Sequence, residues 1–70
     1  MRKKLKKARK DAGFSQQTMA EKIGIHERYY KSLESGGRLG AIWIWDAIED
    51  ILGANQRFLR EIQPDTADNP

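Results

Sequence analysis

The side chains that could do chemistry in this 70-residue chain are mostly basic, and they are unevenly distributed. Residues 1–35 contain ten Lys or Arg and four Asp or Glu, whereas residues 36–70 contain three and six. Basic side chains gathered on one part of a small domain neutralise the phosphates of a polyanion, and the released counterions favour binding. A solvated basic helix that serves solubility fits the same distribution, so charge alone leaves both interpretations open.

Groups for catalysis or metal binding are scarce. The chain has one histidine, His26, no cysteine and no glycine-rich loop that would hold phosphates. Glu49 and Asp50 are adjacent, so on a helix they point in different directions and do not form a carboxylate pair. We therefore expect a protein that is not an enzyme and that binds no metal, cofactor or small-molecule ligand.

The composition also predicts a soluble, cytoplasmic protein without a membrane partner. No apolar segment follows the basic residues 1–10, as it would in a signal peptide, and none approaches the roughly 20 residues of a membrane-spanning helix. A basic membrane-surface peptide would carry large aromatic residues beside its lysines, and these are missing.

Five short helices must position the basic and polar groups. Apolar residues recur at spacings of three and four, glycines fall where helices should end, and no proline precedes Pro64. Ser15 and Asn55 are suitable N-caps. The predicted helices cover residues 2–12, 16–23, 26–34, 41–52 and 56–62, and residues 63–70 are expected to form a flexible polar tail.

Two of these helices have a predicted inward face. In the first helix it consists of Leu5, Ala8 and Ala12. In the fourth helix the apolar stripe consists of Ile42, Trp45, Ile48, Ile51 and Leu52. Trp43 and Ile44 lie off that stripe and are predicted to form an exposed apolar patch, extended by Phe58 and Leu59.

The second and third helices are predicted to form a helix-turn-helix. Their connection around Gly24 is too short for antiparallel packing, so the two axes must cross steeply. A steep crossing brings the two backbones close together, which the small side chain of Ala20 allows. Gly24 can adopt the positive φ that such a turn needs. Ile23, Ile25 and Leu33 supply an apolar seam. A plain hairpin of two helices is the alternative that this spacing leaves open.

The sequence resembles the Cro and phage-repressor family, also called the XRE or lambda-repressor-like helix-turn-helix family. Five segments carry the resemblance over about residues 5–62, in the family's order and spacing. They are Leu5-Lys6-Lys7-Ala8-Arg9, Gly13-Phe14-Ser15-Gln16, Ala20-Glu21-Lys22-Ile23-Gly24-Ile25, Leu33-Glu34-Ser35-Gly36 and Ile51-Leu52-Gly53. The resemblance implies an all-α, five-helix DNA-binding domain over residues 1–62, with its helix-turn-helix in helices two and three.

The resemblance also implies which residues read bases. The third helix would lie in the major groove, with Glu27, Arg28 and Ser32 at reading positions and Tyr29 and Lys31 nearby. Arginine can donate two hydrogen bonds to guanine, and glutamate can accept one from cytosine. Because phosphates repel a carboxylate, Glu27 has two other possible roles, orienting Arg28 or stabilising the helix N-terminus.

Other matched positions imply phosphate contacts and a structural pair. Gln16 matches a glutamine that binds a DNA phosphate, and Gln17 and Arg38 are further candidates for phosphate contacts. A solvated loop arginine is the alternative for Arg38. Arg9 and Glu34 match a pair that forms an internal salt bridge between the first helix and the end of the third.

The sequence departs from the family pattern at three residues. His26 stands at the helix-three cap, where serine or threonine is usual. Tyr30 replaces an aliphatic core residue, and a buried ring there needs a partner for its hydroxyl. Glu49 occupies a position that is commonly small and apolar.

These observations predict a sequence-specific, double-stranded DNA-binding transcription regulator of the Cro-like repressor or controller type, from a prokaryote or a phage. We expect it to bind a near-palindromic operator as a homodimer. The predicted dimer interface consists of Trp43, Ile44, Phe58 and Leu59. Two alternatives are a monomer whose last helix covers Trp43, and a protein-interaction module, such as an antitoxin or adaptor, that presents Trp43 and Ile44 to another partner.

Overall fold

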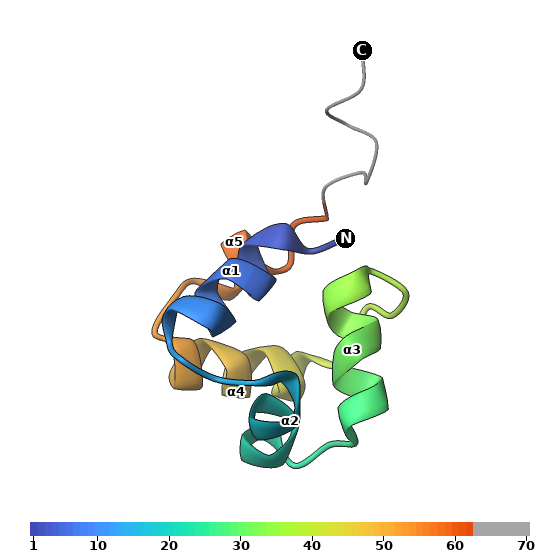
Figure 1. Ribbon diagram of the computed structural model, residues 1–70. Helices are drawn as coiled ribbons and strands as arrows, with labels where there is room; N and C mark the ends of the chain where they lie inside the picture. Colours follow the sequence, from blue (N-terminus) through green and yellow to red (C-terminus); the bar gives the residue numbers. More distant parts are fainter. Residues whose placement is uncertain (63–70) are drawn as a thin grey trace.

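The computed structural model describes residues 1–62, and the predicted tail, residues 63–70, lies outside the described residues. Residues 1–62 contain five helices and no strand, which confirms the all-α class. The helices are α1 (Lys3–Asp11), α2 (Gln16–Ile23), α3 (Glu27–Ser35), α4 (Ile42–Leu52) and α5 (Gln56–Leu59). In Figure 1, α3 lies along the right-hand side of the molecule, and the other four helices all lie to its left. The face of α3 that points away from them is left open.

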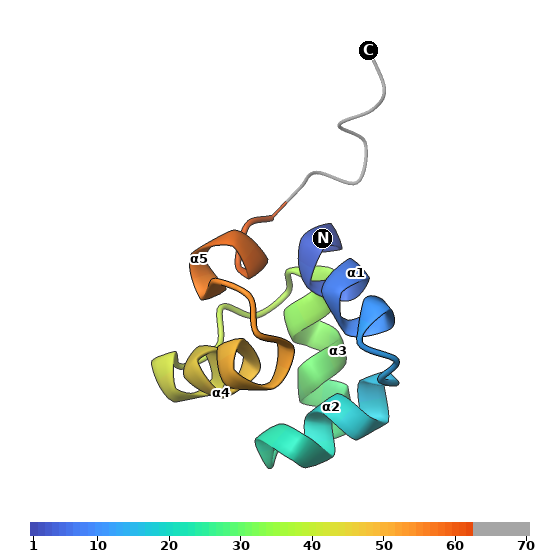
Figure 2. The ribbon, with the colours of Figure 1, turned by 90° about the vertical axis from the view of Figure 1, so that its left-hand side faces the viewer.

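The α2 and α3 helices form the predicted helix-turn-helix. The Ser15 Oγ accepts a hydrogen bond from the Thr18 backbone N–H at 3.0 Å and caps α2. Gly24 ends α2 at φ +93°, a left-handed conformation that glycine adopts without steric cost. The two views show the axes of α2 and α3 crossing steeply (Figures 1 and 2). This geometry excludes the plain hairpin.

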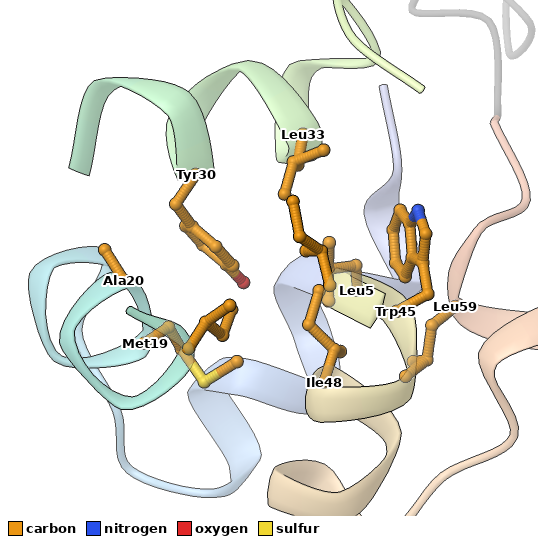
Figure 3. Close-up of a cluster of buried hydrophobic side chains, with 10 residues drawn as sticks. Leu5, Met19, Ala20, Tyr30, Leu33, Trp45, Ile48 and Leu59 are labelled. Atoms are coloured by element: carbon orange, nitrogen blue, oxygen red, sulfur yellow. The ribbon is translucent and has the colours of Figure 1, made fainter. Parts of the chain in front are cut away.

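One apolar core holds the helices together, and every helix contributes to it (Figure 3). Ala20 is buried where α2 meets α3, as the steep crossing requires. The core consists of Leu5, Met19, Ala20, Ile23, Tyr30, Leu33, Ile44, Trp45, Ile48 and Leu59. The open face of α3 is therefore presented by a helix whose other side is firmly packed.

Two predictions about inward faces were wrong. On α4, Ile44 is 2% exposed and packs in the core, whereas Ile42 is 74% exposed. Ile44 and Ile48 are four residues apart and share a face, so burying Ile48 on this side carries Ile44 inward and leaves Ile42 outside. On α1, Ala12 is exposed because α1 ends at Asp11, and Arg9 takes the inward position beyond Leu5.

The last helix is shorter than predicted. It ends at Leu59 instead of reaching residue 62. Arg60 is the residue that follows the helix, so its carbonyl lies outside the helical hydrogen-bond pattern. The Arg2 guanidinium donates to this carbonyl instead, from Nε at 2.9 Å. None of the helices in residues 1–62 has the length and apolar character needed to cross a bilayer.

Candidate nucleic-acid interface

The open face of α3 carries the residues that were predicted to read bases. Tyr30, Leu33 and Glu34 face inward and are buried, so residues 28, 31 and 32 face outward. Arg28 and Lys31 are exposed. No hydrogen bond or ion pair of the described residues engages the exposed Arg28 guanidinium, so its donors are available to a ligand.

Three of the other predicted reading residues, Glu27, Lys31 and Ser32, already have partners within α3. Glu27 pairs with Lys31, one helical turn away, at 3.4 Å between Oε2 and Nζ. This pair, rather than one with Arg28, is the contact that Glu27 makes. The Ser32 Oγ donates to the Arg28 carbonyl at 3.2 Å, which leaves its lone pairs to accept a hydrogen bond from a ligand.

Arg38 joins this face from the loop that follows α3. Its guanidinium lies over the Tyr29 ring, 5.1 Å from the centroid, a distance at which the ring attracts the cation. The two residues help to line an open pocket of about 610 Å³ at the start of α3. Its lining consists of His26, Glu27, Arg28, Tyr29, Ser32 and Arg38. The structure thus gathers five of the predicted DNA-contacting residues in one hollow.

Behind this face, Arg9 and Glu34 form a buried ion pair between α1 and α3. Arg9 Nε lies 2.5 Å from Glu34 Oε2, and the two side chains are 8% and 2% exposed. Arg9 Nη1 also donates to the Phe14 carbonyl at 2.8 Å. A buried charge that loses its partner is costly, so the pair holds α1 against the end of α3.

Gln16 and Gln17 stand in different surroundings at the start of α2. The Gln16 Nε2 donates to Glu34 Oε1 at 3.2 Å, and the residue is half-buried. Its amide nitrogen keeps a second hydrogen for a further acceptor. Gln17 is exposed. A phosphate contact by Gln16 would therefore come from a side chain that Glu34 holds in place.

Tyr30 is buried next to this network, near enough to Glu34 and Arg9 for both to influence its hydroxyl. Its hydroxyl has no hydrogen-bond partner within the described residues, although the sequence predicted that burial would demand one. Burial raises the pKa of Tyr30 well above its usual value, and the neighbouring Glu34 carboxylate, which attracts the hydroxyl proton and repels a phenolate, raises this pKa further.

The other two departures from the family pattern have local consequences. The His26 side chain makes no capping hydrogen bond at the start of α3. Glu49 is half-buried and accepts a hydrogen bond from Gln56 Nε2 at 3.1 Å, which links α4 to α5. Glu49 thus has a structural contact in place of the usual apolar packing.

The predicted dimer patch is only partly at the surface. Trp43 and Phe58 are 56% and 51% exposed. Ile44 and Leu59 are buried in the core, and their assignment to an interface was wrong, because both side chains hold α4 and α5 onto the domain. Other large apolar side chains are exposed instead, namely Leu39, Ile42 and Ile62.

Comparison with models of protein families matches residues 5–40, just over half of the chain, to the family described as Helix-turn-helix. The chain belongs to this XRE-type family. XRE-family proteins are DNA-binding transcription regulators and are generally not enzymes, so this chain is a DNA-binding regulator of the XRE type. Comparison with curated proteins and with solved structures gave no match.

The structure adds to this XRE domain one residue that the sequence did not single out. Arg2 is 2% exposed and touches the end of α3, the following loop and the end of α5. In the sequence it is one of seven basic residues among the first ten, and nothing in their spacing distinguishes it. Its burial follows from contacts with residues 31 to 58 positions away, which no local pattern of the sequence indicates.

Proposed function

We propose that this XRE-family chain is a Cro-like repressor or controller-type regulator that acts in the cytoplasm of a prokaryotic cell. It binds a near-palindromic operator as a homodimer, with α3 in the major groove. The observation that supports the proposal best is the open face of α3, where Arg28 is exposed and unpartnered. A rigid helix with free donors on its outward side suits the reading of base edges.

The residues divide into those that read bases and those that hold the phosphates. Arg28 donates to guanine O6 and N7, so each half-site contains a G·C pair. Ser32 accepts a hydrogen bond from a base, because its own hydrogen is committed to the Arg28 carbonyl. Gln16, Gln17 and Arg38 contact phosphates, which sets the register of α3 on the duplex.

The homodimer proposal rests on the exposed apolar residues of α4 and α5. Trp43 and Phe58 each expose about half of their surface, and contiguous exposed apolar surface marks association sites. A twofold dimer presents two copies of α3 to half-sites about 34 Å apart, one turn of the DNA helix.

Selection from random duplex DNA at low salt tests ligand and symmetry together. We expect enrichment of two inverted half-sites one helical turn apart, each with a G·C pair. Enrichment of a single half-site would contradict the dimer. No enrichment would contradict sequence-specific binding and favour the protein-interaction module, for which the exposed Trp43 offers a contact surface.

A further inference from the structure

Arg2 lies where α3, α4, α5 and the loop after α3 meet. Its Nη1 donates to the carbonyl oxygens of Leu33, at 2.5 Å, and Arg38, at 2.8 Å. Its Nε donates to the Arg60 carbonyl at 2.9 Å, and its guanidinium lies 5.0 Å from the centroid of the Trp45 ring. Because Arg2 is 2% exposed, it cannot itself reach a bound nucleic acid.

Within residues 1–62, the partners of the Arg2 guanidinium are carbonyl groups and an aromatic ring, and none of them is a carboxylate. Burial lowers the pKa of this guanidinium, and the positive charge of Arg60 lowers it further. Burying a charge without a counter-ion costs stability unless its hydrogen bonds are satisfied. Three backbone carbonyls accept hydrogen bonds from Arg2, so this side chain fixes the relative positions of three backbone segments.

Two of those carbonyls belong to the segments that carry the reading face, namely α3 and the loop after it. Leu33 is in the last turn of α3, and Arg38 follows the glycines that end this helix. One nitrogen atom bonds both carbonyls, so it fixes the backbone of Arg38 relative to the end of α3. The side chain of Arg38 then lies over the Tyr29 ring, on the outer part of the same helix.

We propose that Arg2 is the positioning residue for Arg38. It holds the loop so that the Arg38 guanidinium stays on the Tyr29 ring at the edge of the reading face, where it binds a DNA phosphate. This inference rests on the proposed DNA-binding function. The planar fork of arginine is required, because a lysine ammonium at the same place does not reproduce three bonds in fixed directions.

The first test measures how DNA affinity depends on salt. Arg38→Gln should lower affinity about tenfold, the loss expected for one charge-assisted hydrogen bond. It should also reduce the slope of log affinity against log salt by about 1. Arg2→Lys keeps the positive charge but loses the planar guanidinium. It should therefore cause the same loss of affinity and the same reduction in salt slope, and it should cause no further loss when combined with Arg38→Gln.

Two further variants make this test specific. Lys3→Gln removes a charge from the neighbouring exposed position, and we expect the Arg38→Gln effect to be unchanged in its presence. Arg2→Met keeps an apolar contact with Trp45 and replaces Arg2→Lys if circular dichroism shows that the latter is unfolded. Additive effects at Arg2 and Arg38, in variants that are folded, would overturn the proposal.

The second test needs no DNA. The Tyr29 ring should shift the NMR signals of the Arg38 side-chain protons upfield, and this shift should be lost in Arg2→Lys and retained in Lys3→Gln. An unchanged shift in Arg2→Lys overturns the positioning role even if the wild-type protein binds DNA. A shift that depends on Arg2, in a protein that binds no duplex, supports the positioning role while the proposed function fails.

Discussion

Single residues in this domain are constrained mainly by whether their buried polar atoms find partners. The Glu34 carboxylate serves both Arg9 and Gln16, and the buried Arg2 finds three carbonyl acceptors. The Tyr30 hydroxyl is the exception among the described side chains. In a chain whose core is this small, one unpaired polar atom is a large fraction of the net stability.

Replacing Tyr30 by phenylalanine should stabilise the protein. Tyr30→Phe keeps the buried ring and removes the hydroxyl that has no partner, so the free energy of unfolding should rise by about 1 kcal/mol. Urea unfolding at pH 7 measures the change. Tyr29→Phe, at a half-buried position, is the matched control and should change stability by less than about 0.5 kcal/mol. A clear loss in Tyr30→Phe would mean that the hydroxyl is hydrogen-bonded.

Tyr30 should also make the protein sensitive to alkali. Its pKa is raised in the folded state, so above the unfolded value of 10.0 the unfolded chain loses this proton while the folded chain keeps it. The folded state then binds more protons, and stability falls as pH rises. The difference in unfolding free energy between wild type and Tyr30→Phe should be constant below about pH 9. At higher pH the unfolding free energy of the wild type should fall relative to that of Tyr30→Phe, by up to about 1.4 kcal/mol per pH unit. Lysine titration is common to both proteins and cancels.

At the reading face, Arg28 and Gln16 should differ in the kind of loss they cause. Arg28→Ala should cost about 1 to 3 kcal/mol on the selected operator and relax specificity at one position, because a bidentate base contact is lost. Gln16→Ala should weaken binding to all duplexes alike, because it removes a phosphate contact. Titration of the operator and of single-base variants distinguishes the two. Uniform losses in both variants would remove Arg28 from the base-reading set.

At the scale of elements, the angle between α2 and α3 depends on a turn that only a few residues allow. Gly24 has φ +93°, and both its own N–H and that of Ile25 bond the Ala20 carbonyl, at 2.8 and 3.0 Å. Ala20 leaves the room that close approach of the two helices needs. The turn therefore fixes α3 relative to α2 before any ligand binds.

Gly24→Ala should destabilise the domain through backbone strain alone. A Cβ at residue 24 meets no atom within 4 Å, so the loss of about 1 to 2 kcal/mol comes from the left-handed conformation. Gly37→Ala is the control, because residue 37 lies outside that conformation and its Cβ would make ordinary contacts with Ser35 and Ser32. It should leave stability unchanged or raise it by up to about 1 kcal/mol. Thermal unfolding compares the two variants, and equal losses would contradict this account.

At the scale of the whole molecule, the five helices enclose a core that leaves several large apolar side chains outside. Trp43, Phe58 and Ile62 each expose about half of their surface, and Leu39 and Ile42 expose more. A domain of this size buries only about 60% of the surface of its extended chain, so association of two copies would add apolar burial that one copy cannot provide.

Trp43→Glu should dissociate the proposed dimer. Light scattering at micromolar concentration should give twice the chain mass for the wild type and the single mass for this variant, because a charge would be buried at the interface. Leu39→Glu, a similar change at a more exposed apolar residue outside α4 and α5, should leave the dimer intact. A wild type that is monomeric at all concentrations would exclude the dimer, and dissociation by Leu39→Glu alone would move the interface to the loop after α3.

Much of this architecture was determined by local features of the sequence. The Ser15 cap, the glycines that end helices and the helical spacing of apolar residues gave the boundaries of α1 to α4 within one residue, and the Asn55 cap gave the start of α5. These signals are reliable because they act between residues at most four positions apart. The Arg9–Glu34 pair followed from the family resemblance, since spacing alone did not distinguish Arg9 from its basic neighbours.

The tertiary structure decided the features that depend on contacts between distant residues. Periodicity gives the angular separation of side chains on α4, but the packing of Ile44 and Ile48 in the core determined which side turned inward. The hydrogen bond from Arg2 to the Arg60 carbonyl joins residues 58 positions apart, and it gives this carbonyl a donor where α5 ends. Only the assembled fold distinguishes Arg2 from the exposed lysines around it, because burial belongs to the whole molecule and not to a segment.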